Sequence, residues 1–329
     1  MKEAFFVRQN KDKWQNYEKI GKNQLSITPD ELANTYIDIT TDLSYAQSKY
    51  RDSKLAQYLN GLSSTLHHAI YKNKREKSKR FISYWLEEVP LEMFKARNAM
   101  FISLIVFAIS IVIGCFSTSV DDTFVRFILG DDYVEMTLRN IANNDPMGVY
   151  KSQSSEFMFL VITLNNLKVA FFAFALGIFT SFGSSYILIS NGVMLGVFQY
   201  FFYQKGLLAD SMLSIWIHGT LEISAIVIAG GAGIHMGNGW LFPGTYSRMA
   251  SFKKSSKTGL KIVIGLVPVI ITAGFLESYI TRHSEFSPIA KASFILVSLI
   301  IVILYFIYLP LKIKKDESKF NPNRVLQTT

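Results

Sequence analysis

The sequence predicts an all-α polytopic membrane protein, with about six transmembrane helices preceded by a helical cytosolic domain. Two observations lead to this prediction. Half of the 329 residues are hydrophobic, and from Ala99 onward they gather into long apolar runs that follow a polar N-terminal region. A run of about 20 apolar residues spans a bilayer. The domains expected are a cytosolic domain, a transmembrane domain with an insertion at about 121–156, and a tail: 1–98, 99–313 and 314–329.

The N-terminal domain is expected to be helical. The sequence TPDE at Thr28–Glu31 matches a capping box with proline at the first helical position. The apolar residues that follow recur at spacings of three and four, as on one face of a helix: Leu32, Tyr36, Ile39 and Leu43. The segment 81–90 is expected to be a short amphipathic piece that ends at Pro90. The basic run at 72–80 is interpreted as a solvated helix end, with contact to anionic lipid as the alternative.

The charge of the loops predicts the orientation of the spans. The segment 121–156 is acidic, whereas the loop 244–257 is basic and lacks acidic residues. Because cytoplasmic loops are enriched in Lys and Arg, 121–156 is expected outside and the loop, like both termini, inside. An odd number of spans must then join the two. The expected spans, with a break at Asn191–Gly192, are roughly 99–120, 166–190, 193–205, 211–236, 259–280 and 290–311.

Charge and cysteine usage exclude several classes. The net charge of +9 would suggest nucleic acid in a soluble protein, but much of it flanks apolar spans, so membrane lipid is the expected partner and nucleic acid is not. The single cysteine, Cys115, excludes a disulfide framework. No nucleotide-binding loop, Rossmann glycine pattern or nucleophile elbow is present, and no cofactor is expected.

Five polar residues within or beside the spans are the candidate site: Asn165, Asn166, His218, Glu222 and Glu277. Ionisable groups in hydrocarbon are costly and need a partner or a function. His218 and Glu222, four residues apart, share a helix face. The predicted orientation places the five in the outer leaflet, either as a hydrogen-bonded packing cluster or as a ligand or ion site. If a metal is bound, the ligands expected are His218, Glu222 and Glu277.

Glycines form the second pattern. Small residues allow membrane helices to approach closely, and they recur here as GxxxG pairs and as the run AGGAG: Gly192, Gly196, Gly230, Gly231, Gly233 and Gly237. Tight packing is the expected role. The same residues motivate the prediction of a homodimer formed through membrane helices, although packing within one chain would also explain them.

The order and spacing of these residues resemble the stage II sporulation protein M family. The most specific part is HGxxE, at His218–Glu222, followed by the glycine run. The resemblance implies a bacterial inner-membrane protein with cytoplasmic termini. The family's namesake is regarded as a scaffold for two peptidoglycan-degrading partners during engulfment. Non-sporulation relatives with a long N-terminal domain, which this chain resembles, are often encoded near MoxR-type ATPases, von Willebrand factor A proteins and RDD membrane proteins.

The function expected is therefore a non-enzymatic membrane scaffold of that type, organising cell-envelope or ATPase-linked partners. A transporter or channel with a site at the polar cluster is the alternative. An intramembrane metal-dependent hydrolase is the least supported of the three functions. HGTLE is not the HExxH of zinc proteases, and one histidine with two carboxylates is a poor zinc set.

Overall fold

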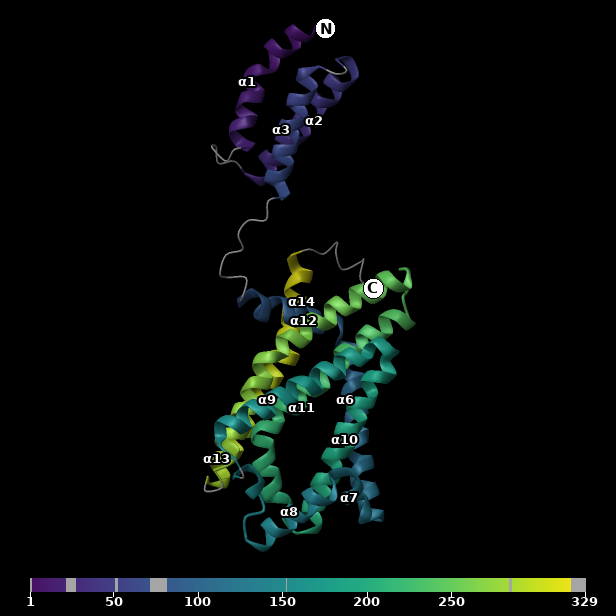
Figure 1. Cartoon of the computed structure of the whole chain (residues 1–329), viewed down its shortest axis with the longest axis vertical. Coiled ribbons are helices and arrows are strands. Elements are labelled where there is room, and N and C mark those ends of the chain that lie inside the picture. Colours follow the sequence, from purple (N-terminus) through teal and green to yellow (C-terminus); the bar gives the residue numbers. More distant parts are fainter. Residues whose placement is uncertain are drawn as a thin grey trace. The chain divides into compact units, whose positions relative to one another are not determined.

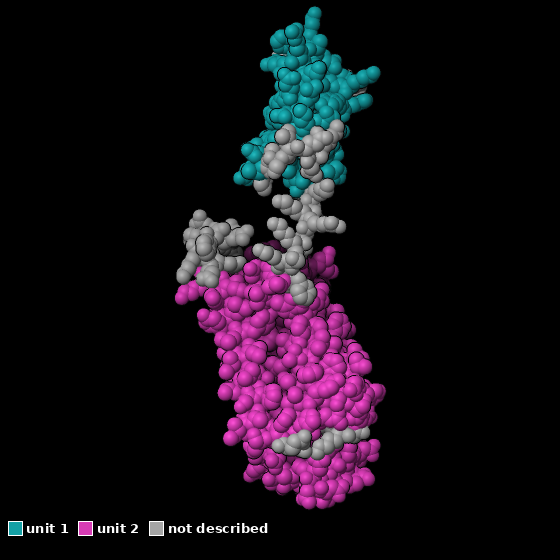
Figure 2. Space-filling model, turned by 90° about the vertical axis from the view of Figure 1, so that its left-hand side faces the viewer, with its two compact units in different colours: residues 1–80 teal, residues 81–329 magenta. Residues whose placement is uncertain are grey.

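A computed structural model describes residues 2–21, 28–50, 53–71, 82–151, 153–283 and 286–320 of the chain. Throughout these ranges the regular structure is helical, which confirms the all-α prediction. The chain divides into two compact units, residues 1–80 and 81–329 (Figures 1 and 2). The basic run at 72–80, for which lipid contact was an alternative, lies outside the described residues.

The first unit consists of three helices, α1 (Glu3–Gly21), α2 (Pro29–Lys49) and α3 (Lys54–Tyr71), which lie alongside one another in Figure 1. They enclose a hydrophobic core of their own whose most buried members include Trp14, Ile39, Leu59 and Leu66. The Trp14 indole also donates a hydrogen bond to Asp42 Oδ2 at 2.8 Å. This unit therefore has the core that an independently packed domain requires.

The start of α2 confirms the predicted capping box. The Glu31 amide donates to Thr28 Oγ1 at 3.3 Å, and the Thr28 amide donates to Glu31 Oε2 at 2.8 Å. Two amides that the first helical turn leaves without partners are thereby satisfied. Downstream, Ile39 is fully buried, and Leu32, Tyr36 and Leu43 pack against the same core, so the predicted helix face is confirmed.

The second unit begins with a π-helical turn, η1 (Tyr84–Glu88), that continues into α5 (Val89–Lys95). The expected end of this segment at Pro90 is wrong. Pro90 occupies the first turn of α5, where a missing N–H costs nothing because that N–H would have no partner within the helix. The helical path therefore continues past the proline to Lys95.

Five helical stretches of the described chain are long and apolar enough to cross a membrane: Arg97–Val120 (α6), Ser155–Gln204, Leu208–Leu241 (α11), Arg248–Thr281 and Pro288–Lys315. The last two are built from shorter helices. The fourth comprises α12 (Arg248–Phe275) and a π-helical turn, η4 (Leu276–Thr281). The fifth contains α13 (Pro288–Val302) and η5 (Ile303–Tyr308), and runs into α14 (Leu309–Phe320). The chain is thus a multi-pass membrane protein.

The 50-residue second stretch contains two helices, α9 (Ser155–Ala175) and α10 (Thr180–Gln204), joined by a short 3₁₀ turn, η3 (Leu176–Phe179). At the junction, Thr180 has a φ of +66°, a value that β-branched residues rarely adopt. This is where the chain turns, because the opening residues of α10 contact α11 close to Gly237 whereas its last residue, Gln204, bonds to Asp122 beyond the far end of α6.

The break expected at Asn191–Gly192, and with it the spans 166–190 and 193–205, is wrong, since both residues lie within α10. The Asn191 side chain donates to the carbonyl of Ile187 one turn back at 2.8 Å, so its amide is satisfied without breaking the helix. Gly192 serves a close approach: a Cβ there would lie 2.7 Å from Ser110 Cβ on α6. The glycine in this NG pair is used for helix packing, and no turn forms.

The acidic insertion is also helical, with α7 (Thr123–Leu129), α8 (Asp131–Ala142) and a 3₁₀ turn, η2 (Gly148–Lys151). Arg126 pairs with Asp131 and Glu135 at 3.0 and 2.7 Å. The apolar side of the insertion packs against the end of α10, where Val134 meets Phe201 and Phe202 in one cluster. Figure 1 places α7 and α8 at one end of the membrane unit and α14 at the other.

Helix α11 is the centre of the membrane unit. Of its apolar window 61% is buried, against 17% for the stretch that begins with α13. It contacts α6, α9, α10, α12 and α13. Polar groups on the buried faces of α11 therefore lie in the protein interior, where they are shielded from lipid.

Candidate functional site

Three of the predicted polar residues meet in the interior of the membrane unit. His218 and Glu222 stand one turn apart on α11, and Glu277 reaches them from η4. One possible ligand atom from each residue lies within 4.8 Å of the other two. His218 is 4% exposed, and the Glu277 side chain is 14% exposed. We call these three residues the trio.

A threonine orients the histidine. His218 Nδ1 lies 3.0 Å from Thr281 Oγ1, and that hydroxyl donates to the carbonyl of Leu276 at 3.2 Å. A hydroxyl has one proton, so when it donates to the carbonyl its oxygen accepts the Nδ1 proton. His218 Nε2 then faces Glu277 with its lone pair, at 3.8 Å from Oε1. The π-helical turn matters here because it presents Glu277 and Thr281 together to α11.

The two asparagines lie on different faces of α9. Asn166 is 6% exposed, and its side chain lies close to the Glu222 carboxyl group. Asn165 faces away and is exposed on the surface of the bundle. Because α9 begins at Ser155 and not near 166, both residues lie in the middle of the helix, so the expectation that they lie near its outer end is wrong.

A cavity of about 330 Å³ reaches His218 and Glu222. Its walls come from α6, α10, α11 and the two helices of the insertion, and they are mainly apolar, with Tyr133 and Asn191 as the other polar members. Two members of the trio, His218 and Glu222, therefore line a cavity that also contacts the insertion helices α7 and α8.

The predicted glycines all lie at close contacts within the chain. A Cβ on Gly196 would lie 2.2 Å from the carbonyl oxygen of Ile111 on α6. A Cβ on Gly233 would lie 2.1 Å from Ser184 Oγ and 2.6 Å from the carbonyl oxygen of Ala173. Additional groups on Gly230, Gly231 and Gly237 would meet Leu188, Met100 and the backbone at Thr180–Ser181, all closer than 3.0 Å.

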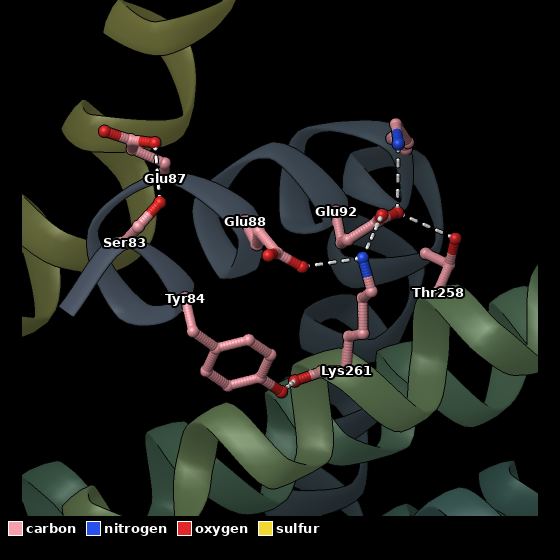
Figure 3. A network of polar contacts seen from close by, with 8 residues as sticks. Ser83, Tyr84, Glu87, Glu88, Glu92, Thr258 and Lys261 are labelled. Carbon is pink, nitrogen blue, oxygen red and sulfur yellow. Dashed lines mark hydrogen bonds and ion pairs between the residues drawn. The ribbon is translucent and has the colours of Figure 1, made fainter. Parts of the chain in front are cut away.

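A second polar cluster lies at the end of the unit opposite α7 and α8. Lys261 of α12 binds Glu88 at 2.9 Å and Glu92 at 3.5 Å, and Thr258 donates to Glu92 at 2.8 Å. Figure 3 shows Glu88 and Glu92 reaching from η1 and α5 toward Lys261. Burial alone would raise the pKa of Glu92, but the Thr258 hydroxyl and the nearby ammonium groups outweigh it and hold this pKa below its ordinary value.

Two aromatic residues extend this cluster. The Tyr84 hydroxyl donates to the carbonyl of Lys261 at 2.7 Å, and the Trp85 indole donates to the carbonyl of Gly265 at 3.2 Å. The Tyr305 hydroxyl holds the other side of the turn by donating to the carbonyl of Trp85 at 2.7 Å. We call these contacts of η1 and α5 with α12 and η5 the clamp, because they fix the segment that leads from the first unit into the membrane unit.

Sequence reasoning did not find the clamp. A signal existed, since Glu88 and Glu92 stand four residues apart directly before an apolar span and share one helix face. Glu92 pairs locally with Lys95 at 3.2 Å. Lys261, which contacts both glutamates, lies 169 or more residues away, and no local pattern could identify it.

Comparison with known proteins identifies the family. The family model described as "Stage II sporulation protein M" matches residues 103–282, more than half of the chain, so the protein belongs to the stage II sporulation protein M family of membrane proteins. A second family model, a domain of unknown function (DUF8413), matches residues 4–72, which are α1 to α3. No curated protein and no solved structure matches the chain.

Proposed function

We propose that the protein is a non-enzymatic membrane scaffold, which anchors cell-envelope or ATPase-linked partners to the bilayer through its first unit. The observation behind this proposal is the clamp. A separately packed helical domain precedes a segment that four side-chain hydrogen bonds and two ion pairs tie to α12 and η5. A domain with its own core, joined through the chain to a membrane bundle whose first segment is held in place, is the arrangement that an anchor requires.

Exposed apolar side chains of the first unit are the contacts to test for such partners. Three large apolar side chains, Phe5, Ile37 and Tyr58, are 60%, 61% and 40% exposed. Exposed apolar groups on a small helical domain are typical of protein-binding surfaces when they are contiguous. By family resemblance the partners to test are a MoxR-type ATPase, a von Willebrand factor A protein and an RDD membrane protein.

Copurification tests this role. The tagged full chain is expressed with each candidate partner from the same genome, as wild type and as Phe5→Glu with Ile37→Glu. Lys11→Glu, an exposed change in the same unit, is the matched control. We expect at least one partner to be retained by wild type and control and lost from the double variant. If the wild type retains no partner, or if wild type, control and double variant retain a partner equally, the scaffold proposal is contradicted.

A transporter or channel is the second candidate, and the cavity beside the trio supports it. Flux measured in proteoliposomes distinguishes the two. A scaffold gives no flux above empty vesicles and keeps its partners in Glu222→Gln. A transporter gives flux that Glu222→Gln abolishes, and this result would replace the first proposal.

We further propose the topology. Helices α6, α9, α10, α11, α12 and the stretch that begins with α13 each cross a bacterial cytoplasmic membrane, with both termini and the loop 244–257 in the cytoplasm and 121–156 outside. The Lys and Arg distribution supports this orientation. In a Cys115→Ser background, an impermeant thiol reagent added to intact cells should label Asp132→Cys and leave Lys253→Cys unlabelled. The reverse pattern would overturn the orientation.

A homodimer is also proposed, on a ground other than the glycines, which are occupied by contacts within the chain. Asn165 and Lys168 lie on the exposed face of α9, at mid-helix. An amide and an ammonium group facing lipid are costly, so a second copy covering them would stabilise both. Mass measurement in nanodiscs should give two chains for wild type and a larger share of monomer for Lys168→Glu. A monomeric wild type would contradict the dimer.

A further inference from the structure

We infer that His218, Glu222 and Glu277 bind a divalent first-row transition-metal ion. One histidine with two carboxylates is a poor set for Zn²⁺, so the set fits Mn²⁺ better, and Zn²⁺ is tested beside it. The site goes beyond the proposed scaffold role and does not depend on it. The three possible ligand atoms lie within 4.8 Å of one another, so small side-chain adjustments suffice to bring each to a shared ion. An imidazole nitrogen favours transition metals over Mg²⁺ and Ca²⁺, and two carboxylates favour the harder members of that series.

The trio brings an imidazole and two carboxyl groups together in the protein interior. The distance from His218 Nε2 to Glu277 Oε1 is 3.8 Å, which is too long for a hydrogen bond. Two carboxylates held this close in a low-dielectric interior repel each other. A dication between them makes the site neutral overall, since two negative charges and an uncharged imidazole balance it.

The histidine is oriented as a metal ligand would be. Histidines that bind metals almost always donate their second ring N–H to an oxygen, which fixes both the ring and the tautomer. Thr281 Oγ1, 3.0 Å from His218 Nδ1, supplies that oxygen, and its own proton goes to the carbonyl of Leu276. Nε2 is therefore the nitrogen that faces Glu277.

Asn166 supports one of the carboxylates. It is 6% exposed and its side chain lies against the Glu222 carboxyl group, and carboxylates that bind metals are themselves held by hydrogen-bonding neighbours. The cavity of about 330 Å³ that reaches His218 and Glu222 gives an ion and its waters a route to the site.

Calorimetric titration of the full chain tests the inference. The protein is purified in mild detergent, stripped with a chelator and titrated with Mn²⁺, Zn²⁺ or Mg²⁺. We expect one Mn²⁺ or Zn²⁺ per chain, with Mg²⁺ bound at least tenfold more weakly. His218→Gln and Glu277→Gln should each weaken binding at least tenfold. His235→Gln changes the other histidine of α11 and should have no effect. Absence of saturable Mn²⁺ and Zn²⁺ binding, or unchanged binding in both site variants, would overturn the inference.

A second measurement uses only the wild type, in case the variants fail to fold. Protein carrying ¹⁵N-labelled histidine is loaded with Mn²⁺ and studied by pulsed electron paramagnetic resonance. Coupling of the metal to a single histidine nitrogen supports the site. Bound Mn²⁺ without nitrogen coupling would overturn it, because every arrangement proposed here includes His218.

Discussion

The two halves of α11 differ in how closely their neighbours approach. From Ala225 to Gly239, glycine and alanine let other helices come into backbone contact, and a Cβ on Gly233 would lie 2.1 Å from Ser184 Oγ. From Leu208 to Glu222, larger side chains hold the neighbours apart, and a Cβ on Gly219 would find its nearest atom, on Ile215, at 3.5 Å. The cavity and the trio occupy this second kind of environment. Close packing leaves no room for a ligand, so any binding site must lie in the half where the helices separate.

The largest expected effect contrasts two glycines, one from each half. Gly233→Ala forces a methyl group against Ser184 and the carbonyl oxygen of Ala173, so overpacking should cost about 1–3 kcal/mol or more. Gly219→Ala meets ordinary contacts and should be neutral or slightly stabilising, because alanine favours a helix by about 1 kcal/mol. Thermal unfolding in detergent compares the two. Equal melting temperatures of Gly233→Ala and Gly219→Ala would contradict the difference in packing between the two halves of α11.

The clamp gives the next largest effect. Glu92→Ala removes the acceptor of the Thr258 hydroxyl and one of the two carboxylates that contact Lys261, and a loss of about 1–3 kcal/mol in the free energy of unfolding is expected. Glu87→Ala, at an exposed position on the same segment, is the control and should change little. Hydrogen exchange of the peptide covering 84–95 reports the effect locally. If Glu92→Ala leaves that exchange unchanged, the clamp does not fix the segment.

Within the trio, Glu222 separates a structural from a binding role. Glu222→Ala removes both polar atoms of the side chain and should lower the free energy of unfolding by on the order of 1–3 kcal/mol. Glu222→Gln keeps the shape and a carbonyl oxygen but loses the charge. It should therefore melt close to wild type without metal and fail to gain stability when Mn²⁺ is added. A Glu222→Gln protein that Mn²⁺ still stabilises as much as wild type would assign the carboxylate a packing role only.

The smallest effect lies in the first unit and depends on pH. The hydrogen bond from Tyr17, at 2.6 Å, and the charge of Lys13 hold the pKa of Asp38 below its ordinary value despite partial burial. A lowered carboxyl pKa stabilises the fold above the unfolded pKa, and the contribution is lost as pH falls through the lower folded pKa. Protection of α1 and α2 from hydrogen exchange should thus decline below about pH 4.

Asp38→Asn should make that decline shallower, and Asp12→Asn, an exposed change on α1, should not. The effect is small because the Asp38 side chain is 43% exposed and solvent screens it. A steeper decline in Asp38→Asn would contradict the assignment.

The sequence predicted those features of the fold that depend on local residue patterns and on charge. The capping box at Thr28 and the buried face around Ile39 follow from residues three and four positions apart, and both are confirmed. The trio could be anticipated because ionisable residues in apolar helices need the interior. The predicted orientation placed Glu277 in the same leaflet as His218, but the sequence could not give their contact, because 59 positions separate them and the packing of η4 on α11 brings them together.

The errors arose where a residue has two uses. The NG pair at Asn191 reads as a turn, yet the asparagine bonds back along the helix and the glycine admits α6. Pro90 reads as a helix end, yet it begins α5. Asn165 and Asn166 read as a pair, although neighbours in a helix point about 100° apart and only one faces the interior. In each case the tertiary neighbour, absent from the local pattern, decides between the two uses.

The measurement that tests the division of α11 most directly is an anomalous difference map from crystals of the full chain grown with Mn²⁺. The account predicts one peak beside the first half of α11, about 2.0–2.3 Å from His218 Nε2 and from a carboxylate oxygen of both Glu222 and Glu277, and none beside Gly230–Gly237. A map without a peak at the trio, showing Glu222 and Glu277 hydrogen-bonded to each other or to His218, would contradict it.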